Sequence, residues 1–135
     1  MSSSTSLPLE HNGRTHYVHE LTQAMRNKFS AWMKSHAIQE TMSLRAQLPG
    51  DVFRDLMSSL RDDIAIKKLY EFGGEKYVDM VSTEDGAREF ARLVLNDPSL
   101  LDAEIDALME AKGQEFDELF RTVNTKPDAP TQGKA

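Results

Sequence analysis

The stretch LPLEHNGRTHYVHEL, residues 7–21, determines the first structural element of the fold. In it, two segments of alternating apolar and polar residues flank the dipeptide Asn12-Gly13. Asn-Gly between such segments is the strongest short-range signal for a two-residue type I′ turn. The pattern therefore predicts an antiparallel β-hairpin with its register fixed by the turn. The predicted cross-strand pairs, which share one face, are His11 with Arg14, Leu9 with His16, and Leu7 with Val18.

Three of the four histidines lie in this hairpin: His11, His16 and His19. The two-residue period of a strand places His19 on the opposite face from the other two. Arg14 lies beside the remaining pair, and its positive charge disfavours a bound cation. We therefore interpret the cluster as strand packing rather than as a metal site or a catalytic site.

Beyond the hairpin the sequence has helical periodicity. Thr22 is a good N-cap for a long helix that Pro49-Gly50 would end. The predicted fold is therefore mainly α, with an N-terminal β-hairpin packed on a bundle of about five helices. The later helices are expected from an N-cap at Asp51 to about residue 70, over 75–81, from a capping box at 82–85 to Leu95, and over 99–123.

Apolar residues at helical spacing predict the buried face of each helix. On the first helix a second apolar pair, Ile38 and Met42, points away from that face, either toward another helix of the domain or toward a partner. With Trp32, this pair is our prediction for the partner-binding residues. The residues expected in the core are Met25, Phe29, Trp32, Met33 and His36, then Phe53, Leu56, Met57, Leu60 and Ile64, then Ala87, Phe90, Ala91 and Val94, and finally Leu101, Ile105, Leu108, Met109, Phe116, Leu119, Phe120 and Val123.

The composition predicts one domain. The chain has 135 residues, of which 39% are hydrophobic and 28% charged, typical of a globular protein. Residues 1–6 are expected to form a flexible leader, residues 7–123 a single helical domain with its hairpin, and residues 124–135 a disordered tail.

Charge and composition exclude several classes of function. The absence of cysteine excludes disulfides, thiolate nucleophiles and Cys-ligated zinc. The net charge of −6 argues against nucleic acid and anionic lipid as partners. No apolar run approaches the roughly 20 residues that span a bilayer, and the N-terminus lacks the features of a secretory signal. We therefore expect the protein to stay in the cytoplasm where it is made.

Nothing in the sequence has the spacing of a catalytic site. Ser35 and His36 are neighbours on one helix, so their side chains diverge by about 100° and cannot form a nucleophile–base pair. Gly73-Gly74 lacks both the spacing and the preceding strand of a phosphate-binding loop. We therefore predict an interaction protein that is not an enzyme and needs no metal or other cofactor.

Two stretches of the chain together resemble a known family. They are LEHNGRTHYVHELTQAMRNKFSAWMKSHA, residues 9–37, and LYEFGGEKYVDMVSTEDGAREFARLVLNDPSLLDAEIDAL, residues 69–108. In both pattern and size the chain is similar to the small tail assembly chaperones of long-tailed bacteriophages and prophages. The residues that carry the resemblance are Asn12, Gly13, Tyr17, Thr22, Trp32, Phe72, Gly73, Gly74, Gly86 and Pro98.

The resemblance implies a specific function. Such chaperones coat the helical tape-measure protein in the host cytoplasm during tail assembly, and they leave as tail-tube subunits polymerise around it. They need no cofactor, and many are made in two lengths by a ribosomal frameshift. Two alternatives stay open: a phage virion component, such as a head–tail connector or minor tail protein, or a non-viral helical adaptor. Each of these readings predicts a protein partner and leaves self-association open.

Overall fold

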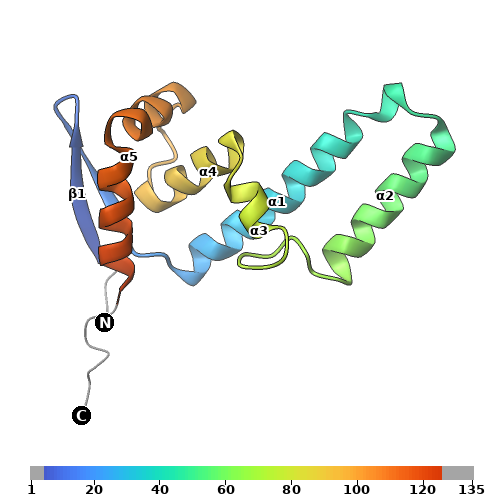
Figure 1. Cartoon of the computed structure of the whole chain (residues 1–135), viewed down its shortest axis with the longest axis horizontal. Helices are drawn as coiled ribbons and strands as arrows, with labels where there is room; N and C mark the ends of the chain where they lie inside the picture. The colour runs from blue at the N-terminus through green and yellow to red at the C-terminus, as the bar shows by residue number, and fades with distance from the viewer. Residues whose placement is uncertain (1–4, 126–135) are drawn as a thin grey trace, which may run out of the picture. The chain divides into compact units, whose positions relative to one another are not determined.

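The computed structural model describes residues 5–125, and it confirms the predicted fold class. The chain is mainly helical (65%), with an N-terminal two-stranded antiparallel hairpin followed by five α-helices (Figure 1). The first and last elements reach into the expected leader and tail, of which residues 1–4 and 126–135 lie outside the described range. The elements are β1 (Ser6–His11), β2 (Arg14–His19), α1 (Gln23–Met42), the 3₁₀ turn η1 (Arg45–Gln47), α2 (Gly50–Ala65), α3 (Tyr77–Val81), α4 (Glu84–Leu95) and α5 (Asp102–Asn124).

The chain divides into two compact units. One consists of residues 1–22 together with 88–135, and the other of residues 23–87. The first therefore holds the hairpin, most of α4 and α5, and the second holds α1, α2 and α3. The single domain expected over residues 7–123 stays a prediction.

The hairpin has the predicted register, with His11 paired to Arg14, Leu9 to His16 and Leu7 to Val18. Asn12 and Gly13 have positive φ angles of 52° and 74°, the left-handed conformation that a type I′ turn requires. Leu9 and Val18 on the shared face are fully buried against α5. Burying such a side chain stabilises a fold by about 1.5–3 kcal/mol, so this face anchors the first unit.

The start of α5 differs from the expectation at one core position. Leu101, predicted to be buried, is 67% exposed, whereas Leu100 is 4% exposed and packs in the same core as Ile105. The difference arises because the helix begins at Asp102, so that Leu100 precedes the N-cap and packs as a hydrophobic staple. Glu104 accepts a hydrogen bond from the backbone N–H of Leu101 at 2.8 Å.

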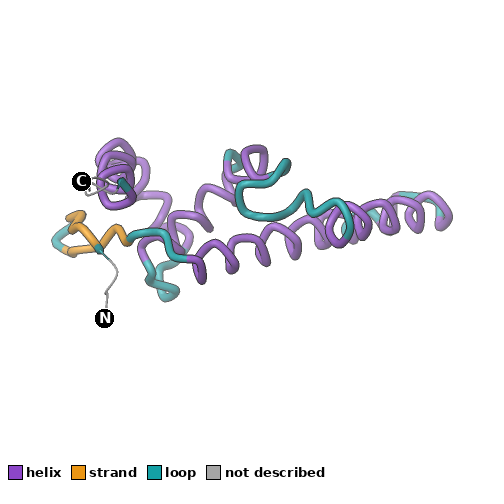
Figure 2. The backbone as a smooth tube through the Cα atoms, turned by 90° about the horizontal axis from the view of Figure 1, so that it is seen from below, coloured by secondary structure: helices purple, strands orange, loops and turns teal. Residues whose placement is uncertain are grey.

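The second unit contains a helical hairpin formed by α1 and α2, which the tube in Figure 2 traces along its length. Helix α1 begins directly after Thr22 but ends at Met42, so the expectation that it continues to residue 48 is wrong. The Ser43 hydroxyl donates to the Glu40 carbonyl at 2.6 Å, which competes with continued helix. Helix α2 has Pro49 as its N-cap, and the predicted cap, Asp51, lies instead in its first turn.

The link from α2 to α3 contains the Gly73-Gly74 pair. The backbone N–H of Phe72 donates to the buried hydroxyl of Ser30 on α1 at 2.8 Å, and Lys34 lies 2.7 Å from the Glu71 carboxylate. Gly73 has a φ of 78°, which a residue with a side chain rarely adopts. Two contacts to α1 therefore hold a turn that depends on glycine.

The cap of α4 is one residue later than predicted. The Thr83 hydroxyl accepts a hydrogen bond from the N–H of Gly86 at 3.0 Å, so Thr83 and not Ser82 caps the helix. The shift also changes which face is buried: Gly86 is buried and Ala87, expected in the core, is exposed. Helices α2 and α3 are shorter than expected, ending at Ala65 and beginning at Tyr77.

Candidate partner-binding surface

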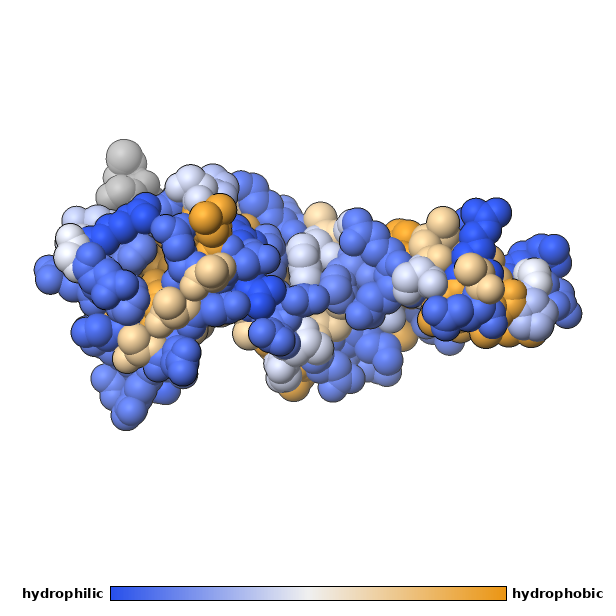
Figure 3. Space-filling model, turned by 90° about the horizontal axis from the view of Figure 1, so that it is seen from above, coloured by the Kyte–Doolittle hydropathy of each residue, from blue (hydrophilic) through white to orange (hydrophobic). Residues whose placement is uncertain are grey.

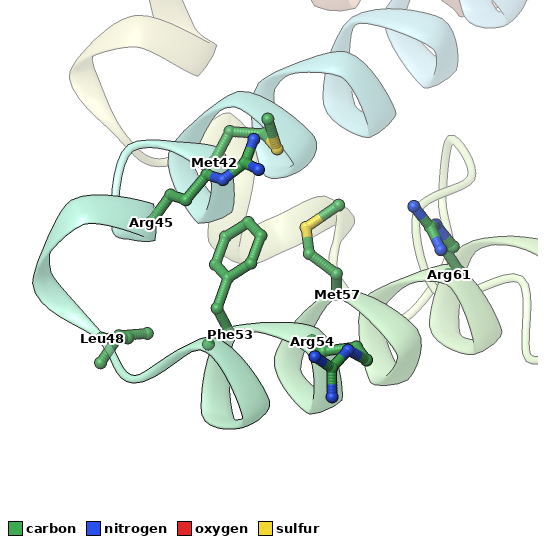
Figure 4. Close-up of a pocket in the computed structure, with 8 residues that line it drawn as sticks. Met42, Arg45, Leu48, Phe53, Arg54, Met57 and Arg61 are labelled. Atoms are coloured by element: carbon green, nitrogen blue, oxygen red, sulfur yellow. The ribbon is translucent and has the colours of Figure 1, made fainter.

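An open groove lies at the end of the α1–α2 hairpin where the chain passes from one helix to the other. Its volume is about 640 Å³. It forms because α1 ends at Met42 and the chain continues through η1, leaving the first turns of α2 opposite the last turn of α1. The residues that line it are Met42, Arg45, Leu48, Gly50, Phe53, Arg54, Met57 and Arg61 (Figure 4).

The floor of this groove is apolar. Phe53 and Met57 lie one turn apart on α2 and point toward Met42 on α1 (Figure 4). Met57 is 8% exposed and Met42 42% exposed, so the floor rises from the core to the surface. The guanidinium of Arg45 lies 5.8 Å from the centre of the Phe53 ring, a cation–π contact that holds the ring against one wall.

Exposed apolar side chains continue beyond the groove on both helices. Ile38, one turn before Met42 on α1, is 38% exposed, and Val52 on α2 is 45% exposed. Leu56, which was expected in the core, is 40% exposed. Figure 3 shows apolar residues at the surface of this end of the helical hairpin. Apolar side chains gathered at a surface are typical of sites where a partner binds.

Three arginines surround the apolar floor: Arg45, Arg54 and Arg61. Across residues 5–125, none of the three forms an ion pair with a carboxylate. In the other unit, by contrast, Arg14, Arg88 and Arg92 form ion pairs. Arg14 contacts Asp97 at 3.1 Å and Arg88 contacts Asp106 at 2.9 Å. The groove is therefore locally positive on a chain of net charge −6.

The structure places the three predicted partner-binding residues in two different environments. Ile38 and Met42 are exposed and lie one turn apart beside the groove. Trp32, six residues before Ile38 and about 120° away around the helix, is half-buried and stacks on Phe29 and His36 with ring centres 5.4 and 4.7 Å apart. Trp32 therefore belongs to an aromatic cluster of the second unit and does not join the exposed pair.

The groove arginines were missed by the sequence reasoning. Arg54 and Arg61 are seven residues apart on one helix, a spacing that places both on one face beside Phe53 and Met57. That signal was present in the sequence. The position of Arg45 was not, because it depends on α1 ending at residue 42.

Two of the three hairpin histidines, His11 and His16, line a second, smaller pocket in the other unit. His11, Arg14 and His16 line it together with Glu104 and Leu100. Burial lowers the pKa of His16, and the charges of Arg14 and His11 lower it further. Nε2 of His11 is buried and has no hydrogen-bond partner among residues 5–125. Within the described range, no group of three or more His, Asp or Glu side chains is placed to hold a metal ion.

No protein-family model, curated protein or solved structure gives a significant match to this chain. Among the described helices, none is both long enough and apolar enough to cross a membrane.

Proposed function

We propose that this protein is a non-catalytic assembly chaperone that binds the helical tape-measure protein during phage tail assembly. The observation that carries the proposal is the exposure of Ile38 and Met42 beside an open apolar groove. A helix with apolar side chains three or four residues apart is the type of partner that such grooves bind.

The residues behind the family resemblance support the fold rather than the binding surface. Asn12 and Gly13 form the hairpin turn, Gly73 has a positive φ, and Gly86 packs against the carbonyl of Met80. The resemblance therefore supports a shared scaffold, and the binding role rests on the exposed side chains.

The direct test is co-expression of the chain with the tape-measure protein and capture of the complex. Replacing both Ile38 and Met42 by Ser is expected to abolish capture while helix content and melting temperature stay nearly unchanged. A matched control replaces both Ile66 and Val78 by Ser; these residues are 73% and 65% exposed and lie elsewhere in the same unit. The control is expected to bind like the wild type. Loss of folding in the first variant would show that the pair belongs to the core.

Two further observations separate the chaperone from the alternatives. A chaperone is absent from purified phage particles, whereas a connector or minor tail protein remains in them. A chaperone gene is also expected to lie beside a very long reading frame that encodes a helical protein, with a slippery sequence near the codons for residues 132–134. Unrelated neighbouring genes and no frameshift site would favour a non-viral adaptor.

A further inference from the structure

We infer that the groove at the end of the α1–α2 hairpin binds an amphipathic helix whose apolar side chains are flanked by Asp and Glu. The inference rests on the proposed function and names the chemistry of the tape-measure segment that the chaperone would bind.

The apolar floor sets the first requirement on the partner. Met42, Phe53 and Met57 come from two helices and leave an open channel between them. Methionine side chains are flexible and polarisable, so they adapt to differently shaped apolar surfaces. A partner helix with Leu, Ile or Phe at positions i, i+3 or i+4, and i+7 would place its apolar stripe on this floor.

The arginines set the second requirement. Arg54 and Arg61 are seven residues apart, about 10.5 Å along α2, and Arg45 belongs to η1, with its guanidinium over the Phe53 ring. Guanidinium groups pair with carboxylates in a bidentate geometry. A partner helix with acidic residues seven apart, beside its apolar stripe, would meet Arg54 and Arg61 together. Since these arginines have no carboxylate partner within residues 5–125, pairing with the helix breaks no existing ion pair.

The surrounding charge argues against a polyanionic partner. Asp51, Asp55 and Asp62 lie on the same helix as the arginines, and the chain carries a net charge of −6. A duplex or an anionic bilayer covers a wide surface, so it would be brought against these carboxylates as well. A single helix contacts only the groove and its rim.

The test measures binding of a fluorescein-labelled synthetic peptide of about 20 residues, enough for a helix to span the groove. The peptide consists of seven-residue repeats with Leu at the first and fifth positions and Glu beside each Leu. A control peptide carries Lys in place of each Glu. The full chain is compared with the variant R54E/R61E and with K28E/R121E. The second variant has the same net charge, but its two exposed positions, Lys28 and Arg121, do not line the groove.

We expect the wild type and K28E/R121E to bind the Glu peptide alike, R54E/R61E to bind it at least about tenfold more weakly, and higher salt to weaken the binding. Circular dichroism of each variant checks that it is folded. The inference would be overturned if all three proteins bound the Glu peptide equally. It would also be overturned if the wild type bound the Lys peptide as tightly as the Glu peptide. So would arginine-dependent binding of phosphatidylglycerol vesicles without binding of the Glu peptide.

Capture of the tape-measure protein separates this inference from the proposed function. If R54E/R61E still captures it as well as the wild type, the groove is not its binding site, but the chaperone function stands. If the Glu peptide binds in an arginine-dependent way and the tape-measure protein is never captured, the groove chemistry stands and the proposed function fails.

Discussion

Among the described glycines, Gly86 is the one where an added Cβ atom would lie closest to another part of the chain, and replacing it by Ala tests this contact. A Cβ atom added there would lie 1.8 Å from the carbonyl oxygen of Met80 and 2.7 Å from its carbon. Carbon atoms in proteins essentially never approach closer than 3.0 Å in this way. The obstructing atoms are backbone, so no side-chain rotation can relieve the clash. The end of α3 and the first turn of α4 must therefore move apart by more than about 1 Å.

The expected cost follows from two opposing terms. Overpacking a tight site costs about 1–3 kcal/mol, and a backbone–backbone clash belongs at the upper end of that range. Alanine is a better helix former than glycine by about 1 kcal/mol, which offsets part of the cost. We therefore expect Gly86→Ala to lower the free energy of unfolding by about 2 kcal/mol.

The assay is urea unfolding followed by the fluorescence of Trp32, the single tryptophan, which lies in the same unit as Gly86. With an unfolding slope of about 2 kcal/mol per molar urea, the midpoint should fall by about 1 M. The matched control is Gly113→Ala, where the added Cβ would have no atom within 4 Å apart from its chain neighbours and the backbone of its own helix. That variant should be unchanged or up to about 1 kcal/mol more stable by circular dichroism. A wild-type midpoint for Gly86→Ala would refute the reasoning.

Three other predictions concern single side chains. The Thr83→Ala substitution should destabilise the fold by about 1 kcal/mol in urea unfolding, because it removes the N-cap of α4, whereas Ser82→Ala should have little effect; the reverse order would place the cap at Ser82. Asn124→Ala should lower the free energy of unfolding by about 1 kcal/mol or more, since its side-chain oxygen accepts the N–H of Leu21 at 2.8 Å and residues 5–125 offer that N–H no other acceptor; a neutral result would mean that water replaces the bond. An NMR titration of His16 should give a midpoint below 6.5, because burial disfavours the charged imidazole. As the pH falls through 6.5, the unfolded state then binds more protons at His16 than the folded state does, so the free energy of unfolding decreases. The His16→Gln variant should lose this part of the pH dependence of stability. A titration midpoint at or above 6.5 would contradict the lowered pKa of His16.

The hairpin shows how far local sequence can determine structure. Asn12-Gly13 requires positive φ at both turn positions, and the two-residue loop then fixes every cross-strand pair. Because side chains alternate across a strand, the register also fixes which residues face the core, and Leu9 and Val18 are buried as predicted. The same register places His11 and His16 on one face of the hairpin and His19 on the other.

Helix boundaries and individual core positions were predicted less well. Shifting a helix start by one or two residues exchanges neighbours between the buried and the exposed face, as at Leu100 and Leu101 and at Gly86 and Ala87. Ser82 and Thr83 are both good caps, and the position of the Met80 carbonyl decides between them. Local propensity gives these alternatives similar energies, so packing selects one of them.

By itself, the sequence determined the class of fold, the hairpin with its register, and the position of Ile38 and Met42 off the main apolar face of the first long helix. These features depend on residues close together in the chain, where backbone preference and periodicity act directly. Only the tertiary structure decided that α1 ends at Met42 and that Arg45, Arg54 and Arg61 surround one apolar groove. A groove between two helices requires side chains brought together by the turn that joins them, and no periodicity within either helix specifies where that turn places them.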